Sequence, residues 1–277
     1  MSLVKKWQIE KSNTLGLVNN LVELKPAFKF IYAKDNKIYG LFDYTLWRIA
    51  HAFLETDTIK DMVLDALSVI DNFTDCLIVT DFTKFTEDGI GESLQSGDTY
   101  TIDKIPSEMK IILTTSSTSG GRRIWVYKNL PSSVSAIWIS CRMMADDEYA
   151  RIDVTDADPS TYSNPPDFYT LMFEIIASSN DTQLRKRVSD TWTHLADEAV
   201  DLTAGTYYKV GFYIDVANGV QKVWRDSDPL DATSPTLSAT DTDITNIIGY
   251  RFTTETGSTS KTLVSGWGIP LVIAWKV

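Results

Sequence analysis

Residues 205–228, GTYYKVGFYIDVANGVQKVWRDSD, decide the fold class of this chain. Apolar side chains occupy every second position from Tyr208 to Val216, with Lys, Gly, Tyr and Asp between them. This period of two is typical of a strand with one buried face. Asn218-Gly219 follows, and this pair supplies the positive φ angles of a tight hairpin turn. The chain then returns from Val220 to Arg225, so the segment predicts an antiparallel β-hairpin with a defined register.

Similar segments continue through most of the chain. They are short and β-rich, and Ser, Thr, Gly, Asp and Pro separate them without an intervening helical period or an internal repeat. About a dozen such strands favour an antiparallel two-sheet sandwich or jelly roll over an alternating α/β sheet. The strands are expected at residues 76–82, 98–103, 109–115, 123–128, 133–143, 148–154, 168–177, 182–188, 206–216, 220–225, 246–254 and 268–276.

Residues 1–71 have a different pattern. They contain a second predicted β-hairpin, with Asp35-Asn36 at its turn. Two amphipathic segments follow, headed by the potential helix caps Asp43 and Asp57. These segments predict a helical hairpin whose apolar stripe must pack on another element or another chain. We therefore expect residues 1–71 to be a small α+β assembly or docking element, and residues 72–277 to form the β-sandwich domain.

Composition excludes several classes of partner. The formal net charge is −11 and the isoelectric point is about 4.7, which disfavours binding to nucleic acid. The densest basic cluster is Arg185-Lys186-Arg187, which we interpret as a solvated strand end in preference to an anion site. No apolar run approaches the roughly 18 residues that a membrane helix needs, and the N-terminus lacks the apolar region of a Sec signal peptide.

Several strand-like segments together resemble a known superfamily. They are NFTDCLIV, VSAIWISCRMM followed by YARIDV, TLMFEIIASSNDTQLRKRV, the hairpin quoted above, and the final GIPLVIAWKV. Their order is similar to that of concanavalin A-like lectins and glucanases, which include laminin G-like modules. The resemblance covers residues 72–277 and implies a jelly-roll sandwich. Members of the superfamily include lectins, adhesion modules, glycoside hydrolases and parts of virus particles.

The residues needed for hydrolysis are not evident. A glycosidase of this fold needs two carboxylates on one sheet face. Asp153 and Asp156 are an odd number of positions apart and should face opposite ways, and Glu174 is isolated among apolar residues. The two histidines, His51 and His194, are accompanied by no nucleophile motif. We expect no catalytic residues and no enzymatic activity.

Metal and disulfide sites are also not predicted. Cys76 and Cys141 have apolar neighbours, which favours buried free thiols over a disulfide. The acidic runs Asp146-Asp147-Glu148 and Asp156-Ala157-Asp158 carry oxygen ligands suited to calcium. However, a chain with 37 carboxylates contains such runs by chance. We predict no cofactor and no metal.

Aromatic residues provide the remaining functional signal. Trp192, Trp224 and Tyr149 lie near predicted strand ends, where exposed rings could stack on the C–H faces of a sugar. Packing inside the sandwich is the competing interpretation and the more common role of such rings.

Three functions remain open. The first is a non-enzymatic structural or attachment protein of a larger assembly, in particular a virus particle, located in a virion or on an extracellular surface. The second is a soluble carbohydrate-binding lectin or adhesion module, and the third is a glycoside hydrolase. A homo-oligomer or multi-chain particle is expected, with a glycan as a possible partner and with neither nucleic acid nor membrane insertion.

Overall fold

The computed structural model describes most of the chain from residue 87 onward and three short segments before it. The described ranges are 30–34, 37–41, 77–78, 87–105, 108–116, 120–161, 166–176, 179–198, 202–226, 235–257, 260–268 and 271–275. The predicted helical hairpin, His51 and Cys76 lie outside these residues. Within these ranges, no helix has the length and apolar character needed to cross a membrane.

The chain divides into two compact units. The first consists of Met1–Thr74 with Asp228–Ser234, and the second of Asp75–Ser227 with Pro235–Val277. In the first unit, β1 (Phe30–Lys34) and β2 (Lys37–Leu41) pair antiparallel. The last residue of β1, Lys34, is opposite the first residue of β2, Lys37. This pairing is that of the predicted N-terminal β-hairpin.

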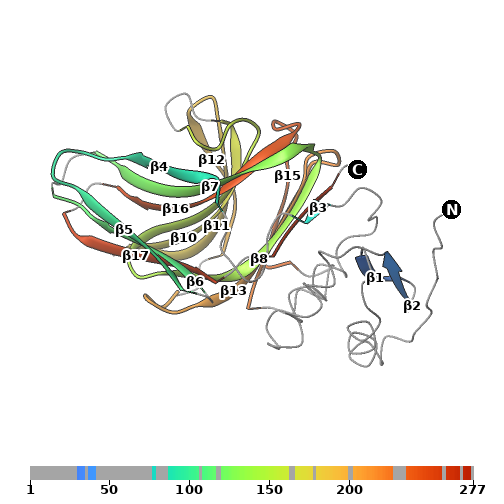
Figure 1. The fold of residues 1–277 in the computed structure, drawn as a ribbon, viewed down its shortest axis with the longest axis horizontal. Helices are drawn as coiled ribbons and strands as arrows, with labels where there is room; N and C mark the ends of the chain where they lie inside the picture. Colours follow the sequence, from blue (N-terminus) through green and yellow to red (C-terminus); the bar gives the residue numbers. More distant parts are fainter. Residues whose placement is uncertain are drawn as a thin grey trace. The chain divides into compact units, whose positions relative to one another are not determined.

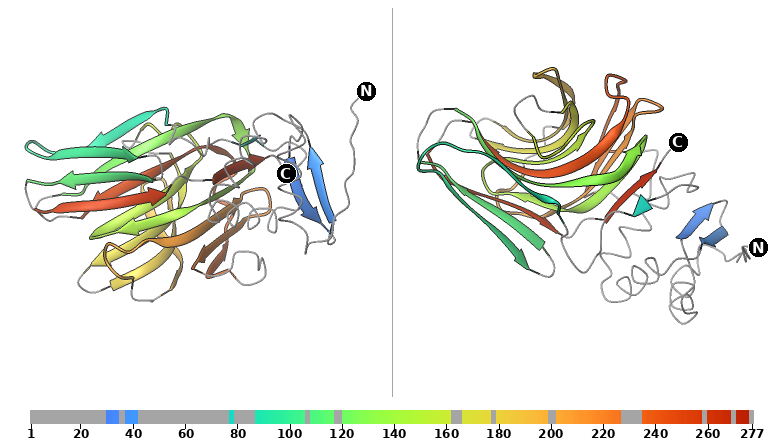
Figure 2. Two further views of the ribbon diagram at one scale, coloured as in Figure 1. Left: turned by 60° about the horizontal axis from the view of Figure 1, so that its bottom comes forward. Right: turned by 45° about the horizontal axis from the view of Figure 1, so that its top comes forward.

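The second unit is a sandwich of two antiparallel sheets (Figure 1). The views in Figure 2 show the same two layers from other sides. The structure thus confirms the predicted mainly β, two-sheet jelly-roll sandwich. The seven-stranded sheet has the order β12 (Thr191–Glu198), β11 (Ser179–Val188), β10 (Phe168–Ile176), β9 (Glu148–Thr155), β16 (Ile247–Thr256), β7 (Arg122–Val134) and β4 (Gly89–Ser93).

The second sheet has nine strands. Its main path is β15 (Leu237–Thr240), β14 (Val220–Arg225), β13 (Tyr208–Asp215), β8 (Ala136–Ala145), β17 (Thr262–Gly268), β6 (Glu108–Thr114) and β5 (Thr99–Ile105). Beside this path, β18 (Leu271–Trp275) pairs with β8 and with β3 (Leu77–Ile78).

The hairpin that decided the fold is formed by β13 and β14, both interior strands of the nine-stranded sheet. The expected face is buried, with Phe212 fully inaccessible. The turn differs from the prediction, because among its residues only Gly219 has a positive φ, of 65°. The Asp215 carboxylate accepts hydrogen bonds from the backbone N (2.9 Å) and Nδ2 (2.8 Å) of Asn218, which shapes a longer turn that needs one left-handed residue.

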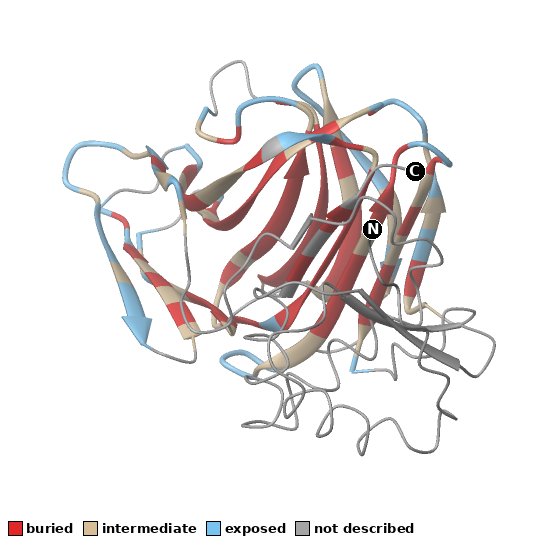
Figure 3. Cartoon of the chain, turned by 45° about the vertical axis from the view of Figure 1, so that its right-hand side comes forward, coloured by how far each residue is buried: buried red, intermediate tan, exposed pale blue. Residues whose placement is uncertain are grey.

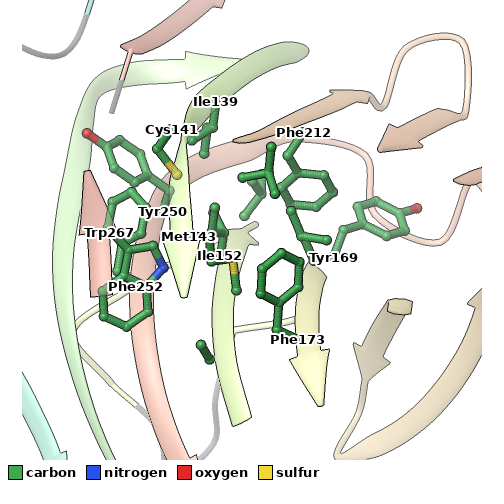
Figure 4. Packing of buried hydrophobic residues seen from close by; sticks show 14 of the residues in the cluster. Ile139, Cys141, Met143, Ile152, Tyr169, Phe173, Phe212, Tyr250, Phe252 and Trp267 are labelled. Atoms are coloured by element: carbon green, nitrogen blue, oxygen red, sulfur yellow. The ribbon is translucent and has the colours of Figure 1, made fainter. Parts of the chain in front are cut away.

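The core lies between the two sheets (Figure 4). Phe252 of the seven-stranded sheet packs against Trp267 of the other, with ring centroids 5.7 Å apart. Cys141 is a buried free thiol, as expected, and burial raises its pKa. Figure 3 shows buried residues along the inner strands of both sheets and exposed residues in loops and edge strands.

Some strands were not predicted: β4, β12, β15 and nearly all of β17. β12 is an exposed edge strand, and β17 contains Ser and Gly, so neither has a clear apolar alternation. β7 was predicted too short, since it continues through Pro131 to Val134.

Candidate functional site

The seven-stranded sheet has an unusually polar side. On β9, Ala150 and Ile152 belong to the core, whereas Arg151 and Asp153 point the opposite way. We call the side turned away from the core the outer face. The strand registers place these residues on it: Arg123, Trp125, Tyr149, Arg151, Asp153, Phe168, Thr170, Glu174, Gln183, Arg185, Trp192, Arg251 and Glu255.

An ion-pair network crosses the middle of the outer face. The fully buried Asp153 accepts a 2.7 Å bond at Oδ2 from Nε of Arg251, and Arg151 lies 3.5 Å from the same oxygen. Arg151 and Arg123 each contact one oxygen of Glu255, both at 2.7 Å. Burial by itself raises the pKa of Asp153, but the charges of Arg151 and Arg251, with hydrogen bonds from Thr170 and Arg251, leave that pKa below its ordinary value. Asp153 is therefore an anion at neutral pH.

Aromatic rings alternate with the guanidinium groups of this network. Arg151 lies 5.2 Å from the ring of Trp192, and Arg251 lies 4.6 Å from that of Phe168 and 5.8 Å from that of Trp125. Trp192 also meets Phe168 edge-on, with centroids 5.4 Å apart. Phe168 and Trp125 are buried, whereas Trp192 keeps 37% of its surface exposed. The stack therefore presents one indole to solvent on a rigid support.

The connection between β9 and β10 covers one end of the outer face. The Pro159 carbonyl accepts a 3.0 Å hydrogen bond from Nε1 of Trp125, and the Thr161 carbonyl accepts one of 3.2 Å from Arg251. The part of the face beyond this cover includes Trp192 on the edge strand β12 and, at the other end of the strands, Tyr149 and Glu174.

Several polar atoms on this part are incompletely paired. Oε2 of Glu174 accepts hydrogen bonds from Nε2 of Gln183 at 2.8 Å and from Oγ of Ser179 at 2.9 Å. Oε1 of Gln183 is buried and has no hydrogen-bond partner among the described residues. The same is true of Nε of Arg185. Buried polar groups normally have partners, so these atoms are left to bond with water or with a ligand.

The outer face carries at least four carboxylates, among them Asp181 directly opposite Glu174, which corrects the expectation that no same-face pair exists. Asp153, Glu174 and Glu255 come from three neighbouring strands, and Tyr149 stands directly between the two glutamates. The prediction was wrong because it considered spacing along single strands, whereas the register joins residues distant in sequence. Asp156 lies beyond the end of β9, in the following loop.

The other candidate residues have varied surroundings. Trp224 is only 1% exposed and packs on Trp138 at 5.3 Å, so it offers no platform for a sugar. Tyr149 is partly exposed, and its pKa is raised by burial and then by the charge of Glu174. His194 is exposed on β12.

The acidic run at the turn between β8 and β9 is paired within the chain. Asp147 and Glu148 contact Nζ of Lys261 at 2.7 and 3.1 Å, and Asp146 accepts a hydrogen bond from the backbone N of Val264. In the described part of the chain, no group of three His, Cys, Asp or Glu side chains is placed to hold a metal ion.

No protein-family model and no curated protein matches the chain. Among solved structures it is similar to a prokaryotic β-1,3-1,4-glucanase (lichenase) derived from a mouse hindgut metagenome, with 8% identity over 73% of this chain and 100% of that one, and a TM-score of 0.48. The winged bean acidic lectin, complexed with methyl-α-D-galactose, matches with 10% identity over 72% and 99% of the two chains and a TM-score of 0.47. A sialidase matches over 73% of this chain but only 18% of its own length, with 10% identity and a TM-score of 0.45. At these identities the likeness concerns the fold alone.

Proposed function

We propose that the chain binds a glycan on the outer face of the seven-stranded sheet and does not hydrolyse it. The exposed indole of Trp192, supported by Phe168 and Arg151, carries this proposal. The C–H side of a sugar ring is apolar and stacks on an aromatic ring, and a ring held by its neighbours loses little conformational entropy when it binds.

Farther along the same face, polar atoms of β10 and β11 suit the hydroxyl groups of an oligosaccharide that extends from the indole. Oε1 of Gln183 is a buried acceptor without a partner among the described residues, and Glu174 is already oriented by Gln183 and Ser179. A hydroxyl group that donates to Gln183 would satisfy an atom that is otherwise desolvated and unpaired. An apolar ring surface and a few fixed polar groups on one face are the usual composition of a ligand site.

The ion pairs argue against hydrolysis. A glycosidase needs one carboxyl that carries a proton and a second that acts as nucleophile or base. Both oxygens of Glu255 contact arginines. Asp153 contacts Arg151 and Arg251, and the pKa of its carboxyl group is lowered. Among the described residues of this face, Glu174 and the Asp181 opposite it lie outside these ion pairs. Hydrolysis would therefore need Glu174 together with Asp181, which opposes it directly on β11, or the release of an arginine from Glu255.

A hydrolase is the second candidate, because Glu174 and Glu255 flank Tyr149 on adjacent strands. Neighbouring Cα atoms in antiparallel strands are about 5 Å apart, so the two glutamates start about 10 Å apart, compatible with an inverting pair. The role in a larger assembly, in particular a virus particle, remains a prediction from the sequence. In such an assembly the outer face would be the surface that attaches to glycans.

A glycan array followed by calorimetry tests the proposal. Trp192→Ala should weaken binding of the best ligand at least about ten-fold, which corresponds to about 1.4 kcal/mol. Tyr100→Ala is the matched control, because Tyr100 is also 37% exposed but lies on β5 of the other sheet. Equal effects of both substitutions would overturn the proposed site. Release of reducing ends from a bound glycan, abolished by Glu174→Gln, would establish the hydrolase instead.

A further inference from the structure

The basic run at residues 185–187 separates into three different environments. Lys186 points to the core side of β11, where its Nζ contacts the carboxylates of Asp241 and Asp243. Arg187 points to the outer face and pairs with Asp190 at 2.7 Å. Arg185 also lies on the outer face, but it makes no hydrogen bond or ion pair with the described residues. The sequence interpretation of a solvated strand end therefore does not describe Arg185.

The position of Arg185 explains why its charge is not matched. Its directly opposed neighbours are Thr170 on β10 and His194 on β12, and neither is a carboxylate. The register of β11 and β12 shifts at Leu184/Arg185, an irregularity of the kind that redirects side chains. Nε of Arg185 is buried, while the side chain as a whole is partly exposed.

Three other arginines of the same face show what Arg185 lacks. Arg123, Arg151 and Arg251 each contact a carboxylate of a neighbouring strand. A guanidinium presents a planar fork of donors that matches a carboxylate with two parallel hydrogen bonds. An arginine of this kind without such a partner, on a face where these three arginines contact carboxylates, is suited to a carboxylate supplied from outside.

We propose that Arg185 binds the carboxylate of an acidic sugar, so that the ligand of the outer face is a uronic or sialic acid-containing glycan. This inference rests on the proposed function, because it assumes that a sugar stacks on Trp192. Trp192 is two residues from His194, which faces Arg185, so the Cα atoms of Arg185 and Trp192 are diagonal neighbours about 7–8 Å apart. One acidic monosaccharide can therefore place its ring on the indole and its carboxylate at the guanidinium.

The net charge of −11 does not prevent this contact. Charges more than about 8 Å away are largely screened at physiological ionic strength. The nearby guanidinium of Arg185 therefore determines whether a carboxylate is attracted to this place. Binding should accordingly weaken as salt is added, which stacking of a neutral sugar on Trp192 would not show.

The test compares acidic oligosaccharides with their methyl esters, which keep the ring and remove the charge. Trigalacturonate, a glucuronate oligosaccharide and sialyllactose are titrated calorimetrically against the full chain. The wild type should bind one of the acids at least about ten-fold more tightly than its ester, the loss typical of one charge-assisted contact. Arg185→Gln should remove this preference while still binding the ester, and Arg185→Lys should restore part of it.

Arg187→Gln is the matched control, since Arg187 is on the same strand and face but already has Asp190 as a partner. It should keep the preference, and thermal melts should show that all variants are folded. Equal affinity of the wild type for acid and ester, or a preference that survives in Arg185→Gln, would overturn the inference while leaving glycan binding intact. Absence of binding to every acidic and neutral glycan would overturn both proposals.

Discussion

Asp153 should be the residue of the outer face on which folding depends most. It is completely buried, and Arg151 and Arg251 both approach its Oδ2. Asp153→Asn keeps the shape of the side chain but removes its charge, which leaves Arg251 buried without an anion. Removing one partner of a buried ion pair typically costs about 3–5 kcal/mol, and we expect a loss of this size in the free energy of unfolding.

Urea denaturation followed by circular dichroism measures this loss. With a slope of about 1–3 kcal/mol per molar urea, the midpoint should fall by at least about 1 M at unchanged slope. Asp103→Asn is the control, because Asp103 is exposed on β5, and it should change stability by no more than about 0.5 kcal/mol. A loss below about 1 kcal/mol for Asp153→Asn would refute the idea that the network holds the face together.

The same network gives a pH dependence. The folded-state pKa of Asp153 is below its ordinary value, so the unfolded chain takes up this proton first as the pH falls. The stability that Asp153 contributes is therefore fully present above the ordinary pKa of aspartate, about 3.9, and is lost as the pH falls through the lower folded value. Asp153→Asn should lack this part of the acid sensitivity of the wild type.

Two further predictions concern the core and the N-terminal segment. Phe212→Ala, at a fully buried position between the sheets, should cost about 3–5 kcal/mol of unfolding free energy in urea titrations, and a loss under about 1 kcal/mol would mean that the site is not packed as described. Deletion of residues 1–71 should leave a folded monomeric β domain while the full chain forms multimers in size-exclusion chromatography with light scattering. A monomeric full chain combined with an unfolded truncation would contradict the assembly role.

Alternation along single strands was sufficient to predict the fold class. The pattern around Phe212 identified a strand that is interior in the structure, because a half-buried strand must place apolar residues at every second position. Trp192 was a candidate from the sequence, but its strand β12 was not predicted, since an exposed edge strand needs no apolar alternation. Trp224, an equal candidate, is buried.

The polar part of the site could not be predicted in the same way. Asp153, Glu174 and Glu255 share a face because of the pairing of β10, β9 and β16, and no spacing within the sequence shows that register. The unpaired state of Arg185 likewise depends on which residues oppose it on neighbouring strands. Such properties follow from the pairing of strands that are distant in sequence.

The most direct test of glycan binding at the outer face is a nuclear magnetic resonance titration of the tryptophan indole N–H groups. The signal of Trp192 is assigned with Trp192→Phe, and the glycan is the best ligand from the array. Our account predicts that Trp192 shifts in a saturable manner, while Trp138 and Trp224, buried in the other sheet, do not. Saturable binding that leaves Trp192 unchanged, or that shifts Trp138 and Trp224 instead, would contradict it.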